Sequence, residues 1–113
     1  MSQIAESPVL APFEIWDVPL DERTTIKFHE PLIVQPKILP PEEPGDQTYW
    51  TVDIPRLNIS AHGLDFEELK DCLESCIHFG WKHYVQPDDI LLSPKVRKIK
   101  RNYLNLAEEV IDG

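Results

Sequence analysis

Residues 49–77, YWTVDIPRLNISAHGLDFEELKDCLESCI, constrain the fold more than any other part of the chain. Polar and apolar side chains alternate over 49–54 and again over 57–62, which predicts two half-buried antiparallel strands. Pro55 separates the two strands, and Gly63 ends the second. The segment contains no recognisable set of catalytic groups. We therefore expect a chain that binds something rather than one that transforms it.

A long amphipathic helix is predicted over residues 65 to about 85. Asp65 and Glu68 form a capping box that satisfies free amides at a helix start. Apolar side chains then recur every three or four residues: Phe66, Leu69, Cys72, Leu73, Cys76, Ile77, Trp81 and Tyr84. Gly80 inside this stretch either weakens the helix or lets another element approach closely.

A second helix is predicted from residue 94 to about residue 110. Ser93 is a suitable N-cap, and Pro94 suits the first helical turn. The apolar stripe consists of Val96, Ile99, Tyr103, Leu106 and Val110. Residues 86–92, QPDDILL, are predicted to be a linker between the two helices.

The N-terminal part of the chain predicts an extended arm followed by strands. Residues 1–23 contain three prolines among acidic and polar residues, which is typical of an extended arm, ordered or disordered when free. Its stretch FEIWDVPL could add a strand to a sheet edge, its own or a partner's. Residues 24–39 are rich in β-branched and apolar residues, and Pro31 and Pro36 predict edge strands or two short strands with a kink. Residues 40–47, PPEEPGDQ, are the clearest loop.

These elements predict an α+β fold in a single domain of residues 24–113, preceded by the arm. A small antiparallel sheet of three to four strands would pack on the long helix, and a C-terminal helix would follow. At 113 residues the chain has room for one hydrophobic core.

Charge and hydropathy narrow the classes of partner. The chain carries a net charge of −9, so nucleic acid is an unfavourable partner for the molecule as a whole. No apolar run approaches the roughly 20 residues of a membrane span, and the N-terminus does not resemble a signal peptide. We therefore expect a cytoplasmic protein without a membrane partner.

The chemical inventory predicts no catalytic residue, no cofactor and no metal. None of the four histidines has a metal-binding spacing. Cys72 and Cys76 share one helix face and are expected to pack as small apolar residues. His62 is expected to be an exposed polar residue on the sheet.

Partner contacts are predicted in three places. Trp16 and Phe13 lie in the arm, and Trp50 lies in the first strand of the central segment; either tryptophan could instead pack in the core. The loop carries the acids Glu42, Glu43 and Asp46. The run KVRKIKR could contact nucleic acid or an acidic partner, through Lys95, Arg97, Lys98, Lys100 and Arg101.

Residues 24–85 resemble the HicB-like antitoxin module. The resemblance rests on the tyrosine-led strand at Tyr49, the turn at Pro55, the glycine at position 63 and the acidic pair at positions 67 and 68. It implies a partial RNase H-like fold without nuclease activity, and a small basic ribonuclease toxin as partner. Many members also bind DNA through a C-terminal segment, whereas residues 86–113 here supply only one further helix.

The function expected from these features is that of a non-enzymatic protein-binding module, an antitoxin-like protein that neutralises a basic ribonuclease-type toxin. Two alternatives remain open. One is an adaptor subunit of a larger assembly that docks through its arm, and the other is a nucleic-acid-binding protein that uses the basic helix. Homo-oligomerisation is also left open.

Overall fold

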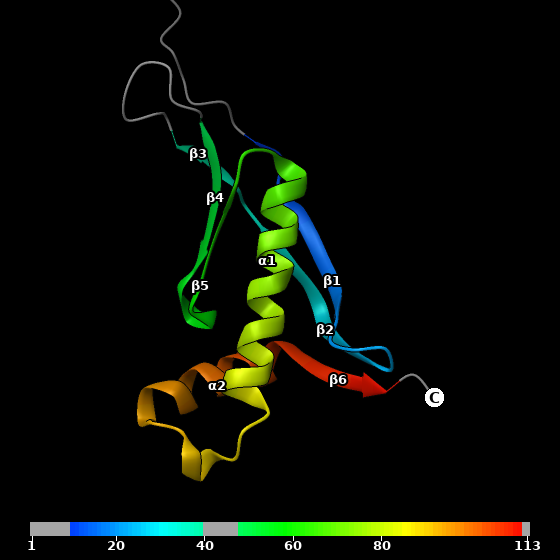
Figure 1. Cartoon of the computed structure of the whole chain (residues 1–113), viewed down its shortest axis with the longest axis vertical. Coiled ribbons are helices and arrows are strands. Elements are labelled where there is room, and N and C mark those ends of the chain that lie inside the picture. The colour runs from blue at the N-terminus through cyan, green and yellow to red at the C-terminus, as the bar shows by residue number, and fades with distance from the viewer. Residues whose placement is uncertain (1–9, 40–47, 112–113) are drawn as a thin grey trace, which may run out of the picture.

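The computed structural model describes residues 10–39 and 48–111, and it confirms the α+β class (Figure 1). The strands divide between two antiparallel sheets of three strands each. Sheet A has the order β1-β2-β6 and consists of β1 (Phe13–Pro19), β2 (Thr24–Val34) and β6 (Ala107–Ile111). Sheet B has the order β3-β4-β5 and consists of β3 (Lys37–Leu39), β4 (Tyr49–Ile54) and β5 (Ile59–Gly63).

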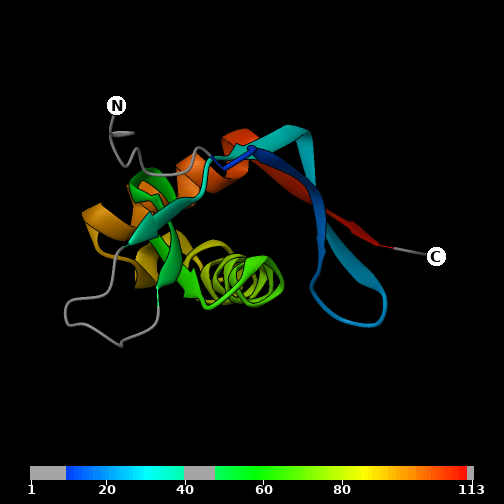
Figure 2. The same ribbon diagram turned by 90° about the horizontal axis from the view of Figure 1, so that it is seen from above.

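The predicted long helix is present and lies in the angle between the two sheets (Figures 1 and 2). It runs as α1 (Phe66–Gly80) and continues into a π-helical turn, η2 (Trp81–Val85). The side chain of Asp65 accepts a hydrogen bond from the amide of Glu68 at 2.9 Å, as the capping signal predicted. The apolar stripe of this helix therefore packs against both sheets.

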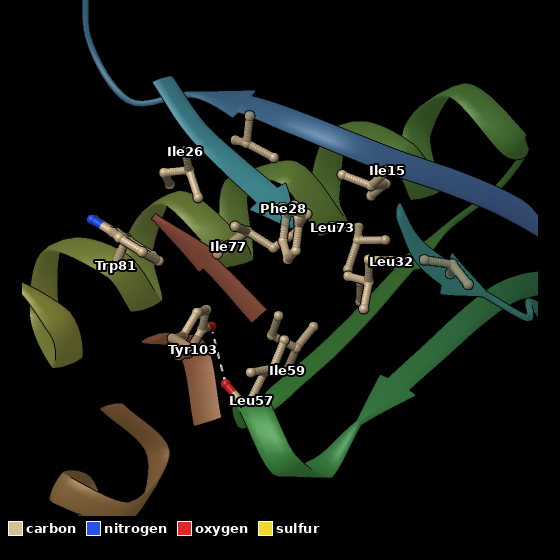
Figure 3. Packing of buried hydrophobic residues seen from close by; sticks show 14 of the residues in the cluster. Ile15, Ile26, Phe28, Leu32, Leu57, Ile59, Leu73, Ile77, Trp81 and Tyr103 are labelled. Atoms are coloured by element: carbon tan, nitrogen blue, oxygen red, sulfur yellow. Dashed lines mark hydrogen bonds between the residues drawn. The ribbon is translucent and has the colours of Figure 1, made fainter. Parts of the chain in front are cut away.

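One hydrophobic core joins the sheets and the helices (Figure 3). Fully buried members come from α1, from both sheets and from α2 (Pro94–Leu106). The largest of these side chains are Trp81, Tyr103, Ile26, Leu57, Leu69, Leu73 and Ile77. The hydroxyl of Tyr103 donates to the carbonyl oxygen of Leu57 at 3.0 Å, so the one polar atom of this ring is satisfied inside the core.

Part of the predicted arm forms strand β1 of the protein's own sheet A. The sequence of this stretch suggests that Phe13, Ile15 and Asp17 share one face and that Glu14, Trp16 and Val18 share the other. This alternation holds as far as Trp16 and is wrong for Asp17 and Val18, because the register with β2 is interrupted at Trp16. Ile15 and Val18 are therefore both buried, while Trp16 and Asp17 are both exposed. An irregularity of this kind re-aims side chains, and here it turns Asp17 outward and Val18 into the core.

The prediction of edge strands or two short strands around Pro31 is wrong, because Pro31 lies inside the single strand β2, which is the central strand of sheet A. The pairing of β2 is nevertheless interrupted there. Between its pairing with Asp17 and its pairing with Ile15, β2 leaves residues 28–31 without a partner on β1. Strand β6 pairs with β2 only as far as Phe28. Pro31, which cannot donate a backbone hydrogen bond, thus lies where the ladder requires none.

The predicted end of the second helix at about residue 110 is wrong. Helix α2 ends at Leu106, and residues 107–111 form β6 along β2. Burial and hydrogen bonding both favour the strand. Ala107 is buried. The carboxylate of Glu109 accepts two hydrogen bonds, from Trp81 Nε1 at 2.5 Å and from Gln86 Nε2 at 3.2 Å. These contacts join residues 23 to 28 positions apart, so no local helical pattern could reveal them.

Two glycines allow close contacts with α1. A Cβ on Gly63 would collide with the backbone of Glu68 and Leu69, so β5 ends directly against the start of the helix. A Cβ on Gly80 would collide with the ring and hydroxyl of Tyr103. Of the two roles predicted for Gly80, the close approach of another element is therefore the one observed.

Candidate partner-binding surfaces

The outer face of sheet B forms a groove, which we call the sheet B groove. Its volume is about 570 Å³. It is lined by Lys37, Leu39, Tyr49, Thr51, Asp53, Ser60, Ala61 and His62. The alternation predicted for this segment is confirmed, because Val52, Ile59 and Ala61 are buried on the inner face. The two strands turn back through a short 3₁₀ turn, η1 (Pro55–Leu57).

Apolar side chains are exposed in the sheet B groove. Leu39 is 52% exposed and Tyr49 is 46% exposed, and these two residues pair across β3 and β4. The ring of Tyr49 also meets the imidazole of His62 edge to face, with centroids 6.2 Å apart. This end of the groove therefore offers an apolar surface that sheet B itself leaves uncovered.

A second, smaller groove continues from the same place. It has a volume of about 430 Å³ and shares Tyr49 and His62 with the first. Glu68 and Asp71, from the first turns of α1, line its far side. Among the described residues, the two grooves together present three carboxylates, counting Asp53, and a single amine, Lys37. The surface is thus apolar in its middle and acidic overall.

The predicted acidic contacts Glu42, Glu43 and Asp46 lie outside the described residues. In the sequence they belong to the segment that connects β3 to β4. In the sequence that segment begins after Leu39, a residue that lines the apolar part of the sheet B groove.

A second surface, which we call the basic corner, combines the start of α2 with the short 3₁₀ turn η3 (Asp89–Leu91). It comprises two aliphatic side chains and the predicted cations: Ile90, Leu91, Lys95, Arg97, Lys98, Lys100 and Arg101. All but Lys100 are exposed. Ser93 caps α2 by accepting from the amide of Val96 at 3.3 Å, as predicted.

Asp89 fixes this corner to α2. Lys100 Nζ lies 2.8 Å from the Asp89 carboxylate and 2.8 Å from the carbonyl oxygen of Pro87, and Arg97 Nε donates to the Asp89 carbonyl at 2.9 Å. The hydrogen bond and charge of Lys100 lower the pKa of the Asp89 carboxyl, and the charges of Arg97 and Arg101 add to this effect. Three of the five predicted cations therefore gather around one carboxylate.

The fixed turn presents two aliphatic side chains to solvent. Ile90 is 85% exposed and Leu91 is 76% exposed. Their backbone is nevertheless ordered, because the amides of Leu91 and Leu92 donate to Asp88 and Asp89 at 2.9 and 3.0 Å. The sequence predicted only a plain linker here. An Ile-Leu-Leu triplet inside a polar loop was the signal that could have identified this turn.

The three predicted aromatic contacts lie in different settings. Trp16 is 56% exposed and donates its indole N–H to Glu14 at 3.0 Å. Phe13 and Trp50 are partly buried, and both rings meet Phe66 edge to face, at 5.1 and 6.4 Å. Of the two roles considered for Trp50, the structure therefore shows core packing on the inner face of sheet B.

The predicted position of the two cysteines is confirmed. Both are free and pack against the core, and Cys76 Sγ lies 3.8 Å from the carbonyl oxygen of Ser60. Burial raises the pKa of the Cys76 thiol, and the neighbouring Cys72 raises it further. A thiol of this kind is a weak nucleophile at neutral pH. Among residues 10–39 and 48–111, no cluster of His, Cys, Asp and Glu could hold a metal ion.

A further pocket, of about 460 Å³, opens where β2 loses its register. Its polar lining comes from His29, Glu30, Arg56 and Asn105, which no sequence pattern brought together. None of the described residues that line it carries a hydroxyl or a thiol group. The four residues come from three distant parts of the chain, so only the tertiary structure identifies this pocket.

In comparisons with known proteins, no family model, no curated protein and no solved structure matches this chain. The described helices include none with the length and apolar character needed to cross a membrane.

Proposed function

We propose that this protein is a non-enzymatic protein-binding module whose main binding surface is the sheet B groove. The observation that carries the proposal is the exposed apolar pair Leu39 and Tyr49 inside a groove of about 570 Å³. Grooves of this size with an apolar centre and a few polar groups are typical of binding sites. Tyrosine is also enriched among the residues that dominate binding energy.

An open sheet edge adds to this surface. Among the described residues, β3 pairs only with β4, so its other edge is free for a partner strand. Strand addition supplies backbone hydrogen bonds, and the adjoining groove would supply side-chain specificity. Edge and groove meet at Leu39, which belongs to both.

The partner we propose is a basic protein. The described residues of the two grooves include three carboxylates and one amine, and in the sequence the acids Glu42, Glu43 and Asp46 belong to the segment between β3 and β4. A net charge of −9 would also attract such a partner over a distance. A small basic ribonuclease toxin is the narrowest form of this proposal, and its support is the resemblance to HicB-like antitoxins.

Co-expression with the products of the adjoining reading frames tests the proposal. We expect a complex that survives size-exclusion chromatography and that Leu39→Arg or Tyr49→Arg weakens at least tenfold. Ile111→Arg is the matched control, because Ile111 is an exposed aliphatic residue on β6, outside the groove. Failure to form any complex, or equal weakening by all three substitutions, would contradict the proposal.

An adaptor that docks through the N-terminal strand is the second candidate, because Trp16 is exposed on the edge strand β1. Deleting residues 1–23 would not test it cleanly, since Ile15, Val18 and Leu20 belong to the core. Trp16→Ser leaves that core intact. Loss of the complex with Trp16→Ser, but not with Leu39→Arg, would favour the adaptor.

A further inference from the structure

The basic corner presents two apolar side chains on an ordered turn, although the hydrophobic core requires neither of them. Asp89, Lys100 and Arg97 hold the turn through polar contacts of 2.8 to 2.9 Å, and neither Ile90 nor Leu91 takes part in the core. A pre-ordered backbone loses little conformational entropy when its side chains dock. Two aliphatic residues held in this way are suited to enter a groove on another molecule.

The net charge of the basic corner is opposite in sign to that of the rest of the chain. Residues 86–106 carry five bases and two acids, a net charge of +3, so the other residues together carry −12. The ligand presented by the corner is therefore apolar at its tip and basic around it. A surface that receives it should be apolar at its centre and acidic around it.

The sheet B groove and the second groove that continues from it together have that chemistry. Leu39 and Tyr49 supply the apolar part, and among the described lining residues Asp53, Glu68 and Asp71 supply three carboxylates against the single amine of Lys37. Its volume of about 570 Å³ lies in the range of clefts that enclose small ligands, which is ample for two aliphatic side chains.

The corner and the groove of one molecule cannot meet each other. In Figure 1, β3 and the start of β4 lie at the top of the molecule, whereas the segment between α1 and α2 lies at the bottom. We infer that Ile90 and Leu91 of one molecule dock into the sheet B groove of a second copy of this chain.

Such a contact is heterologous, because it joins two different surfaces. It leaves a free corner on one copy and a free groove on the other, so further copies can add. The contact is small, and small interfaces are weak. The protein would therefore be monomeric when dilute and associate reversibly when concentrated.

The inference rests on the proposed function in one respect, the choice of the sheet B groove as the receiving surface. It adds that the chain carries its own basic, apolar ligand for that groove. A second copy would then compete with the partner, and dilution would release the groove.

Sedimentation velocity on the purified full-length chain tests the association without any partner. Because the contact is weak, the concentration series should run from about 10 µM to about 1 mM. We expect the average mass to rise above 13.1 kDa with concentration and the rise to shrink with added salt. A mass that stays at 13.1 kDa throughout would overturn the inference.

Three variants identify the surfaces. Ile90→Ser combined with Leu91→Ser removes the tip, and Leu39→Arg blocks the groove; each should weaken association at least tenfold. Ile111→Ser, the matched control on strand β6, should leave the association unchanged. If association persists in the tip and groove variants, it uses another surface. The same conclusion follows if Ile111→Ser abolishes association.

A mixture of the tip variant and the groove variant gives the sharpest result. Each lacks one half of the contact, so the mixture should form dimers but no larger species. If the mixture stays monomeric although wild type associates, the two surfaces do not bind each other. Neither outcome depends on whether an adjoining reading frame encodes a partner.

Discussion

The sheet B groove and the basic corner are built in opposite ways. The groove is concave and follows from the alternation of side chains along β4 and β5, which buries one face and exposes the other. The corner is convex and depends on a single ion pair and a few hydrogen bonds to carbonyl oxygens. The difference teaches that a regular pattern can create a receiving surface, whereas a projecting surface needs specific polar contacts, here between residues 8 to 13 positions apart.

Each surface is also joined to α1 through a glycine. Gly63 brings the end of β5 against the backbone of α1, and Gly80 brings α1 against Tyr103 of α2. The variants below separate the two surfaces, from the largest expected effect to the smallest.

Gly63→Ala should have the largest effect. The added Cβ meets backbone atoms of Glu68 and Leu69, which cannot move aside without shifting sheet B relative to α1. We expect the free energy of unfolding to fall by about 3 kcal/mol, as measured by urea denaturation. A change near zero would mean that β5 and α1 are not packed as closely as the structure shows.

Gly80→Ala should cost less, about 2 kcal/mol. The added Cβ meets a side chain, Tyr103, and alanine also favours the helix by about 1 kcal/mol. In a Tyr103→Phe background the cost should decrease, because the hydroxyl that lies nearest to the new methyl group is gone. An unchanged cost in that background would place the clash elsewhere.

Alkaline pH should weaken the α1–α2 junction that carries the basic corner. Burial raises the pKa of Tyr103 above its usual value near 10. Above pH 10 the unfolded chain loses this proton while the folded chain keeps it, so stability falls as the pH rises. The fall is at most about 1.4 kcal/mol per pH unit for one group.

The matched variants are Tyr103→Phe and Tyr49→Phe. Tyr103→Phe should reduce the slope of stability against pH above pH 10. Tyr49→Phe changes an exposed ring in the sheet B groove and should leave the slope as in wild type. Equal slopes in all three proteins would show that Tyr103 ionises as an exposed tyrosine does.

Asp89→Asn should have the smallest and most local effect. It removes the carboxylate that pairs with Lys100, so the amides of Leu91 and Leu92 should exchange their hydrogens faster. Asp88→Asn is the control, because Lys100 pairs with Asp89. Since the neighbouring cations lower the pKa of Asp89, the protection in wild type should persist at neutral pH and disappear only as the pH falls below about 4.

Much of the fold could be predicted from local sequence. The alternation in β4 and β5, the cap at Asp65, the long α1 and the start of α2 at Ser93 and Pro94 are all present. Each depends on residues only a few positions apart, whose backbone geometry repeats with a fixed period. The same alternation predicts that residues 49, 51 and 53 share one face of their strand, and all three line the sheet B groove.

Only the tertiary structure decided how these elements combine. The separation into two sheets, the end of α2 at Leu106 and the burial of Val18 all depend on strand partners elsewhere in the chain. The basic corner shows the same limit, because the sequence showed five cations but not that three of them gather around Asp89. Local periodicity determines which face of an element is apolar, whereas the burial of that face against a distant segment determines where the element ends and what remains exposed.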